Sequence, residues 1–197
     1  MIKLYWAPRT RAIRAMWMLE EAGVAYERVQ INLTDESSRA NPDFRRASPL
    51  GKVPAIEDGP VRLNDSGAIC LYIADAYPQM QLAPAIGHPD RGAYLQWVLF
   101  TNTSIEPAMI EKMAKIAPNQ RAHGWGSFDS MMSTLRAGLE RGPWILGERF
   151  SAADVLIGSA LFFLTVFKLI DPEPLLDGYV ARCFARPAAQ RAKAAEG

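Results

Sequence analysis

The chain has 197 residues, 49% of them hydrophobic, so it can bury a core and is not a disordered chain. Its 22 lysines and arginines against 21 acids give a net charge of +1, which excludes the strongly basic surface that nucleic acids or anionic membranes attract. Two cysteines and two histidines do not make a disulfide scaffold or a zinc site. The N-terminus lacks an apolar signal core, and the most apolar run, 155–170, is shorter than the roughly 20 residues of a membrane span. We therefore expect a soluble, cytoplasmic protein without a metal.

The first 77 residues predict a mixed α/β fold. An apolar strand over 2–6 is followed by a helix over 10–22, whose apolar side chains recur at helical spacing before Gly23. Alternating apolar and polar residues predict a strand over 25–33. The elements expected next are a loop over 34–51 with a short helix near 42–47, two short strands over 54–58 and 61–64, and a helix from 66 that Pro78 ends.

The rest of the chain predicts a linker and then helices only. Three prolines within 78–90 favour the linker. A proline inside the first long helix predicts a bend about Glu106-Pro107. The stretch Ser151-Ala-Ala-Asp154 has the pattern of a capping box. The expected helices span 90–116, 126–141, 151–169, 173–184 and 187–195.

The first place that suggests chemistry is the start of the helix at Thr10, with Arg11 and Arg14 in its first turn. The positive end of a helix dipole ordinarily favours acidic side chains there, so a hydroxyl and two arginines indicate a site for an anion. The alternative is that Thr10 only caps the helix and that the arginines are solvated.

Two further places in the first half suggest a peptide ligand. Val53-Pro54 puts a proline at the start of a strand, and a cis bond there would expose the peptide groups of Val53; an ordinary trans proline is the alternative. Asp65 and Ser66 precede a helix whose free N–H groups suit a carboxylate, while Asp65 suits an ammonium group. Simple helix capping is the alternative for these two residues.

Together these stretches resemble a cytosolic glutathione transferase. The resemblance rests on "APRTRAIRAMWMLEEAG", "PLGKVPAIEDG", "LNDSGAICLYIAD", the proline-containing linker and "FSAAD" in the helical half, and it covers essentially the whole chain. It implies a thioredoxin-like α/β domain over 1–78, a linker over 79–89 and an all-helical domain over 90–197. It also implies a homodimer, with glutathione as co-substrate and a detoxifying transfer to a hydrophobic electrophile.

The resemblance gives each stretch a role. The Val53 backbone, ahead of a cis Pro54, would pair with the cysteinyl part of glutathione, and Lys52 would meet its glycine carboxylate. Asp65 and Ser66 would hold the γ-glutamyl end. Thr10 falls where serine-type members keep the hydroxyl that donates to the glutathione sulfur, and Arg11 would reinforce it; Tyr5, where tyrosine-type members place a phenol, is the alternative.

The electrophile would bind on the helical domain, where side chains at helical spacing suit either a pocket or a core. Two other functions remain open on this scaffold: glutathione-dependent reduction of disulfides or peroxides, and glutathione binding without catalysis. The first helix region lacks the cysteine that members forming mixed disulfides usually keep. The expected residues of the hydrophobic substrate site are Trp97, Thr101, Ser104 and Ile105.

Overall fold

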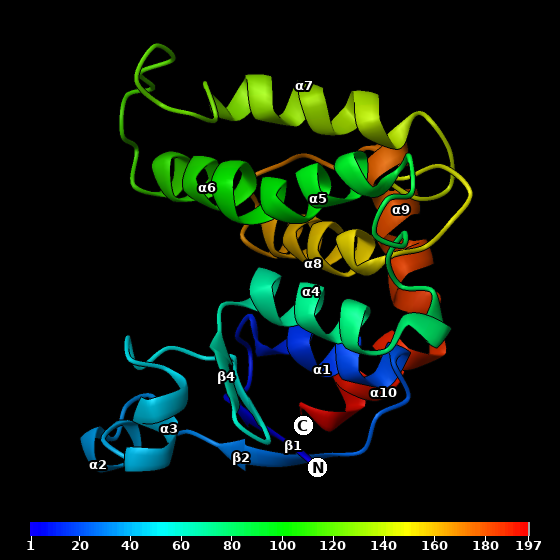
Figure 1. The fold of residues 1–197 in the computed structure, drawn as a ribbon. Helices are drawn as coiled ribbons and strands as arrows, with labels where there is room; N and C mark the ends of the chain where they lie inside the picture. The colour runs from blue at the N-terminus through cyan, green and yellow to red at the C-terminus, as the bar shows by residue number, and fades with distance from the viewer. Residues whose placement is uncertain (197) are drawn as a thin grey trace. The chain divides into compact units, whose positions relative to one another are not determined.

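The computed structural model describes residues 1–196, and its elements follow the expected order (Figure 1). The differences are local: a one-turn helix, α2, forms inside the expected loop, and α1 begins two residues after Thr10. None of the described helices is both long and apolar enough to cross a membrane. The strands are β1 (Ile2–Trp6), β2 (Tyr26–Gln30), β3 (Ala55–Asp58) and β4 (Val61–Asn64). The α-helices are α1 (Ala12–Glu21), α2 (Glu36–Arg39), α3 (Pro42–Ala47), α4 (Ser66–Ala76), α5 (Arg91–Phe100), α6 (Glu106–Met113), α7 (Phe128–Leu139), α8 (Ala152–Val166), α9 (Pro174–Ala185) and α10 (Pro187–Ala195).

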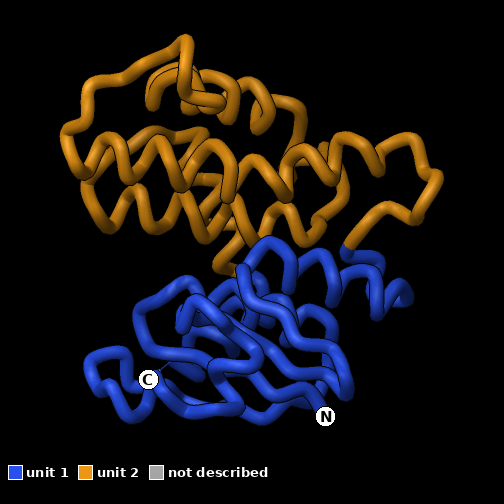
Figure 2. The backbone as a smooth tube through the Cα atoms, turned by 60° about the vertical axis from the view of Figure 1, so that its left-hand side comes forward, with its two compact units in different colours: residues 1–82, 186–197 blue, residues 83–185 orange. Residues whose placement is uncertain are grey.

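The chain forms two compact units (Figure 2). Unit 1 comprises residues 1–82 together with 186–197, and unit 2 comprises residues 83–185. Unit 1 holds the whole sheet, and unit 2 is helical apart from an isolated bridge between Trp144 and Gly147.

Unit 1 is built on a mixed four-stranded sheet in the order β2-β1-β3-β4. β2 runs parallel to β1, whereas β3 and β4 are antiparallel to their neighbours. Leu4 of β1 faces Ile56 of β3 in register, and neither side chain is exposed. α1 packs against both α4 and α10 and buries Trp17 completely. This arrangement has the thioredoxin-like architecture expected for the first part of the chain.

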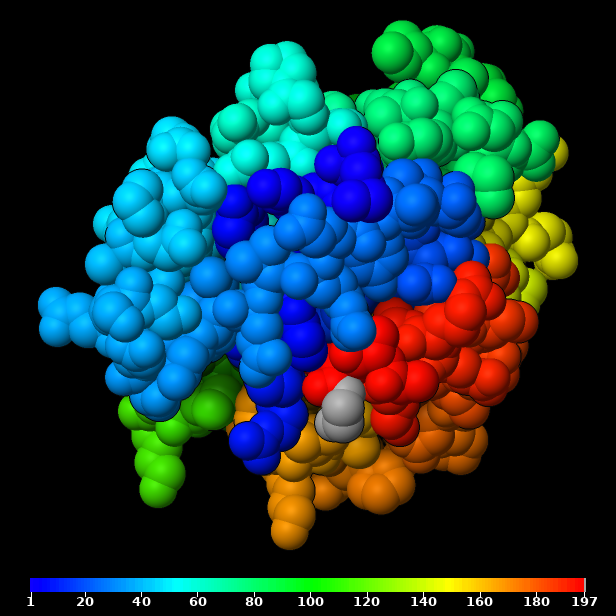
Figure 3. Space-filling view, turned by 90° about the horizontal axis from the view of Figure 1, so that it is seen from below, coloured from blue at the N-terminus to red at the C-terminus, as the bar shows by residue number. Residues whose placement is uncertain are grey.

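α10 belongs to unit 1, which differs from the sequence-based assignment of 90–197 to the helical domain. Its buried face consists of small side chains, Ala188, Ala189 and Ala192, which allow α10 to lie close to α1. Arg186 binds Glu21 through two hydrogen bonds of 2.6 and 2.7 Å, and Arg191 donates to Glu20 at 2.6 Å. Figure 3 shows this C-terminal segment, in red, beside the blue N-terminal segments. Helical spacing predicts α10 but does not predict which element it packs against.

Unit 2 departs from regular helix just before Pro107. Residues Thr101–Ile105 form a π-helical segment between α5 and α6. A proline lacks the N–H that would bond four residues back, so a local π-helical stretch accommodates it. Close packing nearby depends on Gly138 of α7, because a Cβ atom there would lie 2.5 Å from the Trp97 ring.

The capping box expected at Ser151 is confirmed at the start of α8. Asp154 is completely buried, and one carboxylate oxygen, Oδ2, accepts from the N–H and hydroxyl of Ser151. The other oxygen, Oδ1, accepts from the N–H of Ile145 and the hydroxyl of Tyr179, each at 2.8 Å. Burial raises the pKa of Asp154, and these hydrogen bonds oppose that shift. One carboxylate therefore joins α8, α9 and the segment before α8.

Asp154→Ala should destabilise the protein strongly, because it leaves the donors on Ile145, Ser151 and Tyr179 buried without an acceptor. Each such donor costs about 1–3 kcal/mol, so we expect a loss of about 3 kcal/mol or more. For a chain of this size that corresponds to a fall of about 6–12 °C in the unfolding temperature measured by scanning calorimetry. Asp171→Ala, at an exposed position, is the control and should change little; equal effects of the two substitutions would contradict the prediction.

Candidate functional site

Thr10 lies half-buried where β1 leads into α1. Its hydroxyl accepts a hydrogen bond from the N–H of Ala12 at 3.2 Å, in the turn just before α1. The same hydroxyl donates to the carbonyl oxygen of Ala7 at 2.7 Å. The N-cap of α1 is Arg11, which makes no side-chain cap bond, and Arg14 is buried, so the alternative of a capping Thr10 with solvated arginines is not what the structure has. Donation from Thr10 to a ligand would require the hydroxyl proton to turn away from Ala7.

Tyr5, the alternative activating residue, points into the core of unit 1. Its ring is buried and packs against Phe44 with 5.6 Å between ring centroids. Its hydroxyl donates to Glu57 at 2.8 Å. Burial, followed by the hydrogen bond to Glu57 and the charge of this carboxylate, raises the pKa of Tyr5 well above its usual value. A phenol held in this way serves packing rather than thiol activation.

The loop before β3 presents the peptide groups of Val53. Ser48 is completely buried, and its hydroxyl both donates to the Lys52 carbonyl at 2.7 Å and accepts from the Lys52 N–H at 2.9 Å. The Val53-Pro54 bond is cis, as the resemblance implies. Among the described residues, none donates to or accepts from the backbone of Val53, so both of its peptide groups remain open to a ligand. The side chain of Lys52 is exposed.

Asp65 has a left-handed backbone conformation, with φ 81° and ψ 124°. For a residue other than glycine this costs of order 1–3 kcal/mol, and such strain is often found at functional sites. Its Oδ1 accepts from the N–H groups of Gly67 and Ala68 at 2.9 and 3.1 Å, which caps α4. The carboxylate is thus placed at the entrance of α4, on the exposed side of the chain.

Ser66, the first residue of α4, is buried and bonded to a buried charge. Its Oγ accepts from Nη1 of Arg14 at 3.2 Å, and Arg14 is only 1% exposed. The sequence places Arg14 with Thr10 and Arg11 in a candidate anion site at the helix start but does not connect it to Ser66. A signal was present, since Arg14 lies between Ile13 and Met16 in a stretch whose other residues are apolar as far as Leu19. The structure shows that this arginine connects α1 to the start of α4.

The residues expected to contact the electrophile lie mostly in the core of unit 2. Trp97 is 8% exposed, Thr101 is fully buried and Ile105 is 1% exposed, whereas Ser104 is half-buried. Burial of the first three favours core packing, the alternative that their helical spacing left open.

Neither cysteine is placed for redox chemistry. Cys70 and Cys183 are both buried, and no disulfide joins them. Burial raises the pKa of the Cys70 thiol to about 12, which keeps it protonated and unreactive. Within residues 1–196 no group of histidine, cysteine and acidic side chains is arranged to bind a metal.

Unit 1 is thioredoxin-like and unit 2 is helical. This combination of domains is the architecture of the glutathione transferases. The family model of the glutathione S-transferase N-terminal domain matches residues 1–75, and that of the C-terminal domain matches residues 118–182. The chain belongs to the cytosolic glutathione transferase superfamily.

Individual relatives agree with this assignment. A glutathione transferase structure from Methylococcus capsulatus is 30% identical, with a TM-score of 0.85, and the match covers 100% of this chain and 99% of that one. A sphingomonad glutathione S-transferase complexed with glutathione is 30% identical, with a TM-score of 0.80 and coverage of 99% and 98%. The disulfide-bond oxidoreductase YfcG of Escherichia coli (strain K12) is 29% identical over 79% of this chain and 76% of its own length.

Ser66→Ala should destabilise unit 1, because the buried guanidinium of Arg14 loses one acceptor. We expect a loss of about 1–3 kcal/mol in the free energy of unfolding, measured by chemical denaturation. Ser133→Ala, on an exposed face of α7, is the control and should stay within about 0.5 kcal/mol of the wild type. An unchanged stability of Ser66→Ala would show that the Arg14–Ser66 bond contributes nothing to the fold.

Proposed function

We propose that the protein is an enzyme that binds glutathione on unit 1, activates its thiol and transfers it to small hydrophobic electrophiles. The observation that carries this proposal is the open backbone of Val53. A peptide N–H and C=O left without partners beside a sheet suit an extended peptide ligand, which can pair with both. The cysteinyl part of glutathione is such a ligand, and Lys52 supplies a cation for its glycine carboxylate.

Ser66 and Asp65 are the proposed partners of the γ-glutamyl end. The Ser66 N–H is the first of α4 and has no acceptor within the helix. Because Ser66 Oγ accepts from Arg14, its own proton is directed to another acceptor, and a ligand carboxylate suits it. Asp65 carries the negative charge that suits the ammonium group. In this proposal Arg14 is a positioning residue that orients the Ser66 hydroxyl.

The energy needed to ionise the thiol lies within the reach of Thr10 and α1. A free thiol has a pKa of about 8.5, so about 3% is thiolate at pH 7. A shift to about 6.5 requires about 2.7 kcal/mol. A hydrogen bond to a charged acceptor contributes about 1.5–3 kcal/mol, and a helix N-terminus adds about 0.3–1 kcal/mol. Breaking the bond to the Ala7 carbonyl offsets about 0.5–1.5 kcal/mol of this, so the charge of Arg11 becomes a useful supplement.

Reduction of disulfides by glutathione is a second candidate, favoured by the similarity to YfcG. In this reaction two glutathione thiols reduce one disulfide to two thiols and leave as oxidised glutathione, so the protein needs no cysteine of its own. The buried state of Cys70 and Cys183 is consistent with that chemistry. Comparing turnover of 1-chloro-2,4-dinitrobenzene with that of 2-hydroxyethyl disulfide distinguishes the two candidates.

Thr10→Val should raise the pKa of bound glutathione by about 1–2 units, because the hydrogen bond to the sulfur is lost. The measurement is the ultraviolet absorbance of the thiolate in a pH titration of the glutathione complex. Turnover of 1-chloro-2,4-dinitrobenzene at pH 6.5 should fall about tenfold or more.

Two matched variants accompany this experiment. Thr10→Ser keeps the hydroxyl and should behave as the wild type, whereas Tyr5→Phe should leave the thiol pKa unchanged. An unaltered pKa in Thr10→Val would reject Thr10 as the activating residue. Glutathione binding without any thiolate in the wild type would instead favour a non-catalytic binding protein.

The homodimer that the resemblance implies is part of the same proposal. Sedimentation equilibrium at micromolar concentration should give twice the 21.8 kDa mass of the chain. A monomer under these conditions would contradict the proposed dimer. It would not affect the proposed glutathione site, which lies on unit 1.

A further inference from the structure

Unit 2 contains an apolar cavity of about 410 Å³, beside α6 and the segment that follows it. This volume falls in the range of about 300–1,000 Å³ that is usual for small-molecule sites. Ile110 and Ile116, both more than half exposed, contribute to its wall. Exposed apolar side chains gathered at a cavity often mark a binding site. The lining residues are Asn102, Glu106, Pro107, Ile110, Glu111, Ile116, His123 and Trp125.

Glu111 brings a buried carboxylate to this cavity. The residue is only 5% exposed. Both of its side-chain partners bind the same oxygen: Oε2 accepts from Nε1 of Trp125 at 3.0 Å and lies 2.8 Å from Nδ1 of His123. Within residues 1–196 nothing donates to Oε1. Because Oε1 is not among the buried polar atoms without a partner, it remains accessible to solvent, and a ligand that supplies a donor can bind to it.

An aromatic pair stands beside this carboxylate. The rings of His123 and Trp125 are stacked with centroids 4.6 Å apart and an angle of 26° between their planes. Because the bonds to Glu111 fix both rings, they form a rigid plate in the wall of the cavity. Such a plate attracts apolar groups through its area, and an indole face also attracts cations.

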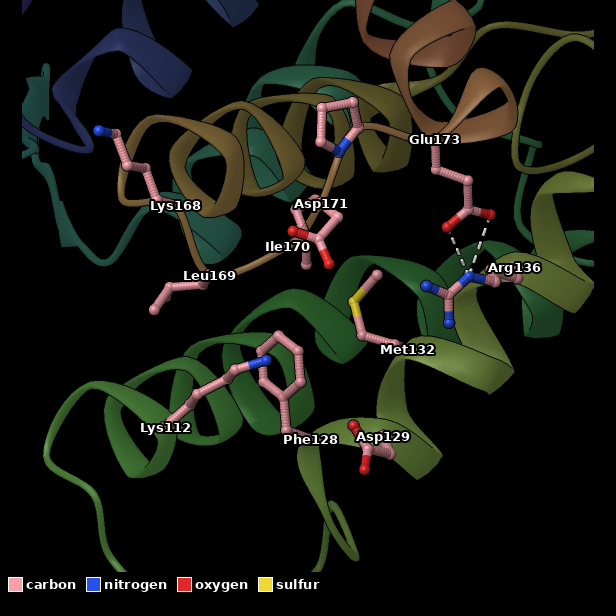
Figure 4. A pocket seen from close by; sticks show the side chains of 11 residues that line it. Lys112, Phe128, Asp129, Met132, Arg136, Lys168, Leu169, Ile170, Asp171 and Glu173 are labelled. Atoms are coloured by element: carbon pink, nitrogen blue, oxygen red, sulfur yellow. Dashed lines mark hydrogen bonds and ion pairs between the residues drawn. The ribbon is translucent and has the colours of Figure 1, made fainter.

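The charges around this cavity are one-sided. Glu106 and Glu111 are acidic, and none of the described lining residues is lysine or arginine. A second cavity in unit 2, of about 630 Å³, provides a contrast (Figure 4). There Arg136 binds Glu173 through its Nε atom at 2.9 and 3.0 Å, and the charges balance. Its charged lining residues are Lys112, Arg136, Lys168, Asp129, Asp171 and Glu173.

We propose that the cavity at Glu111 binds a small organic cation with an apolar body, of the class of primary aryl-alkyl amines. The ammonium group donates to Oε1 of Glu111, and the apolar body lies among the isoleucines and the plate of His123 and Trp125. This site lies entirely within unit 2 and requires no glutathione. It goes beyond the proposed transferase activity, and either can fail without the other.

Three probes with a common skeleton test the charge preference: 2-phenylethylamine, 2-phenylethanol and 3-phenylpropanoate. Binding is measured on the full chain without glutathione, by the shift of the Trp125 indole N–H signal in NMR spectra, which Trp125→Phe assigns. The amine should bind about tenfold or more tightly than the alcohol, and the propanoate should not bind. Similar affinities for the three probes, or no shift of the Trp125 signal with the amine, would overturn the proposal.

Glu111→Gln tests the carboxylate, because its amide oxygen can still accept from Nε1 of Trp125. Affinity for the amine should fall about tenfold, while Asp171→Asn, at the other cavity, should leave it unchanged. If Glu111→Gln does not fold, as judged by circular dichroism, Glu106→Gln provides the second variant and should also weaken the amine. Unchanged affinity in the folded variants would overturn the role of these acids.

Discussion

A buried guanidinium organises unit 1. Arg14 lies on α1 with 1% exposure, and its Nη1 donates to the hydroxyl of Ser66 at the first residue of α4. A buried charge is tolerated only where hydrogen bonds compensate it, so the position of α1 relative to α4 is constrained by this contact. Because the Ser66 hydroxyl accepts from Arg14, its own proton is left for another acceptor. The interaction that holds two helices in place thus also prepares one end of the proposed glutathione site.

Other polar side chains also hold neighbouring segments in place through hydrogen bonds. Ser48 fixes the loop of Lys52 and leaves the Val53 peptide groups open, while Asp65 caps α4 from a strained backbone conformation. In unit 2 the carboxylate of Asp154 joins α8 and α9 through the hydroxyl of Tyr179. At Val53 and at the start of α4, these local hydrogen bonds also determine which atoms remain available for a ligand.

The sequence predicts the elements well and their packing partners less well. Helical and alternating patterns locate α1 and β2 within a few residues, and the capping box at Ser151 is visible as a motif. The helical spacing of its residues does not predict that α10 packs on α1, because a face of alanines can pack against many different helices. It also does not separate a pocket from a core, so Trp97 and Ile105 were equally suited to both. The position of Arg14 among apolar residues predicts that it is buried and needs a hydrogen-bond partner. The sequence does not identify that partner, because Ser66 lies far along the chain.

The central claim is that the open Val53 backbone and the starts of α1 and α4 together hold glutathione. A crystal structure of the protein with reduced glutathione tests it most directly. The account predicts the cysteinyl backbone paired with Val53, the γ-glutamyl carboxylate on Ser66, and the sulfur within hydrogen-bond distance of Thr10 Oγ1. Glutathione bound elsewhere, with the Val53 peptide groups still unpaired and the Thr10 hydroxyl still on the Ala7 carbonyl, would contradict it.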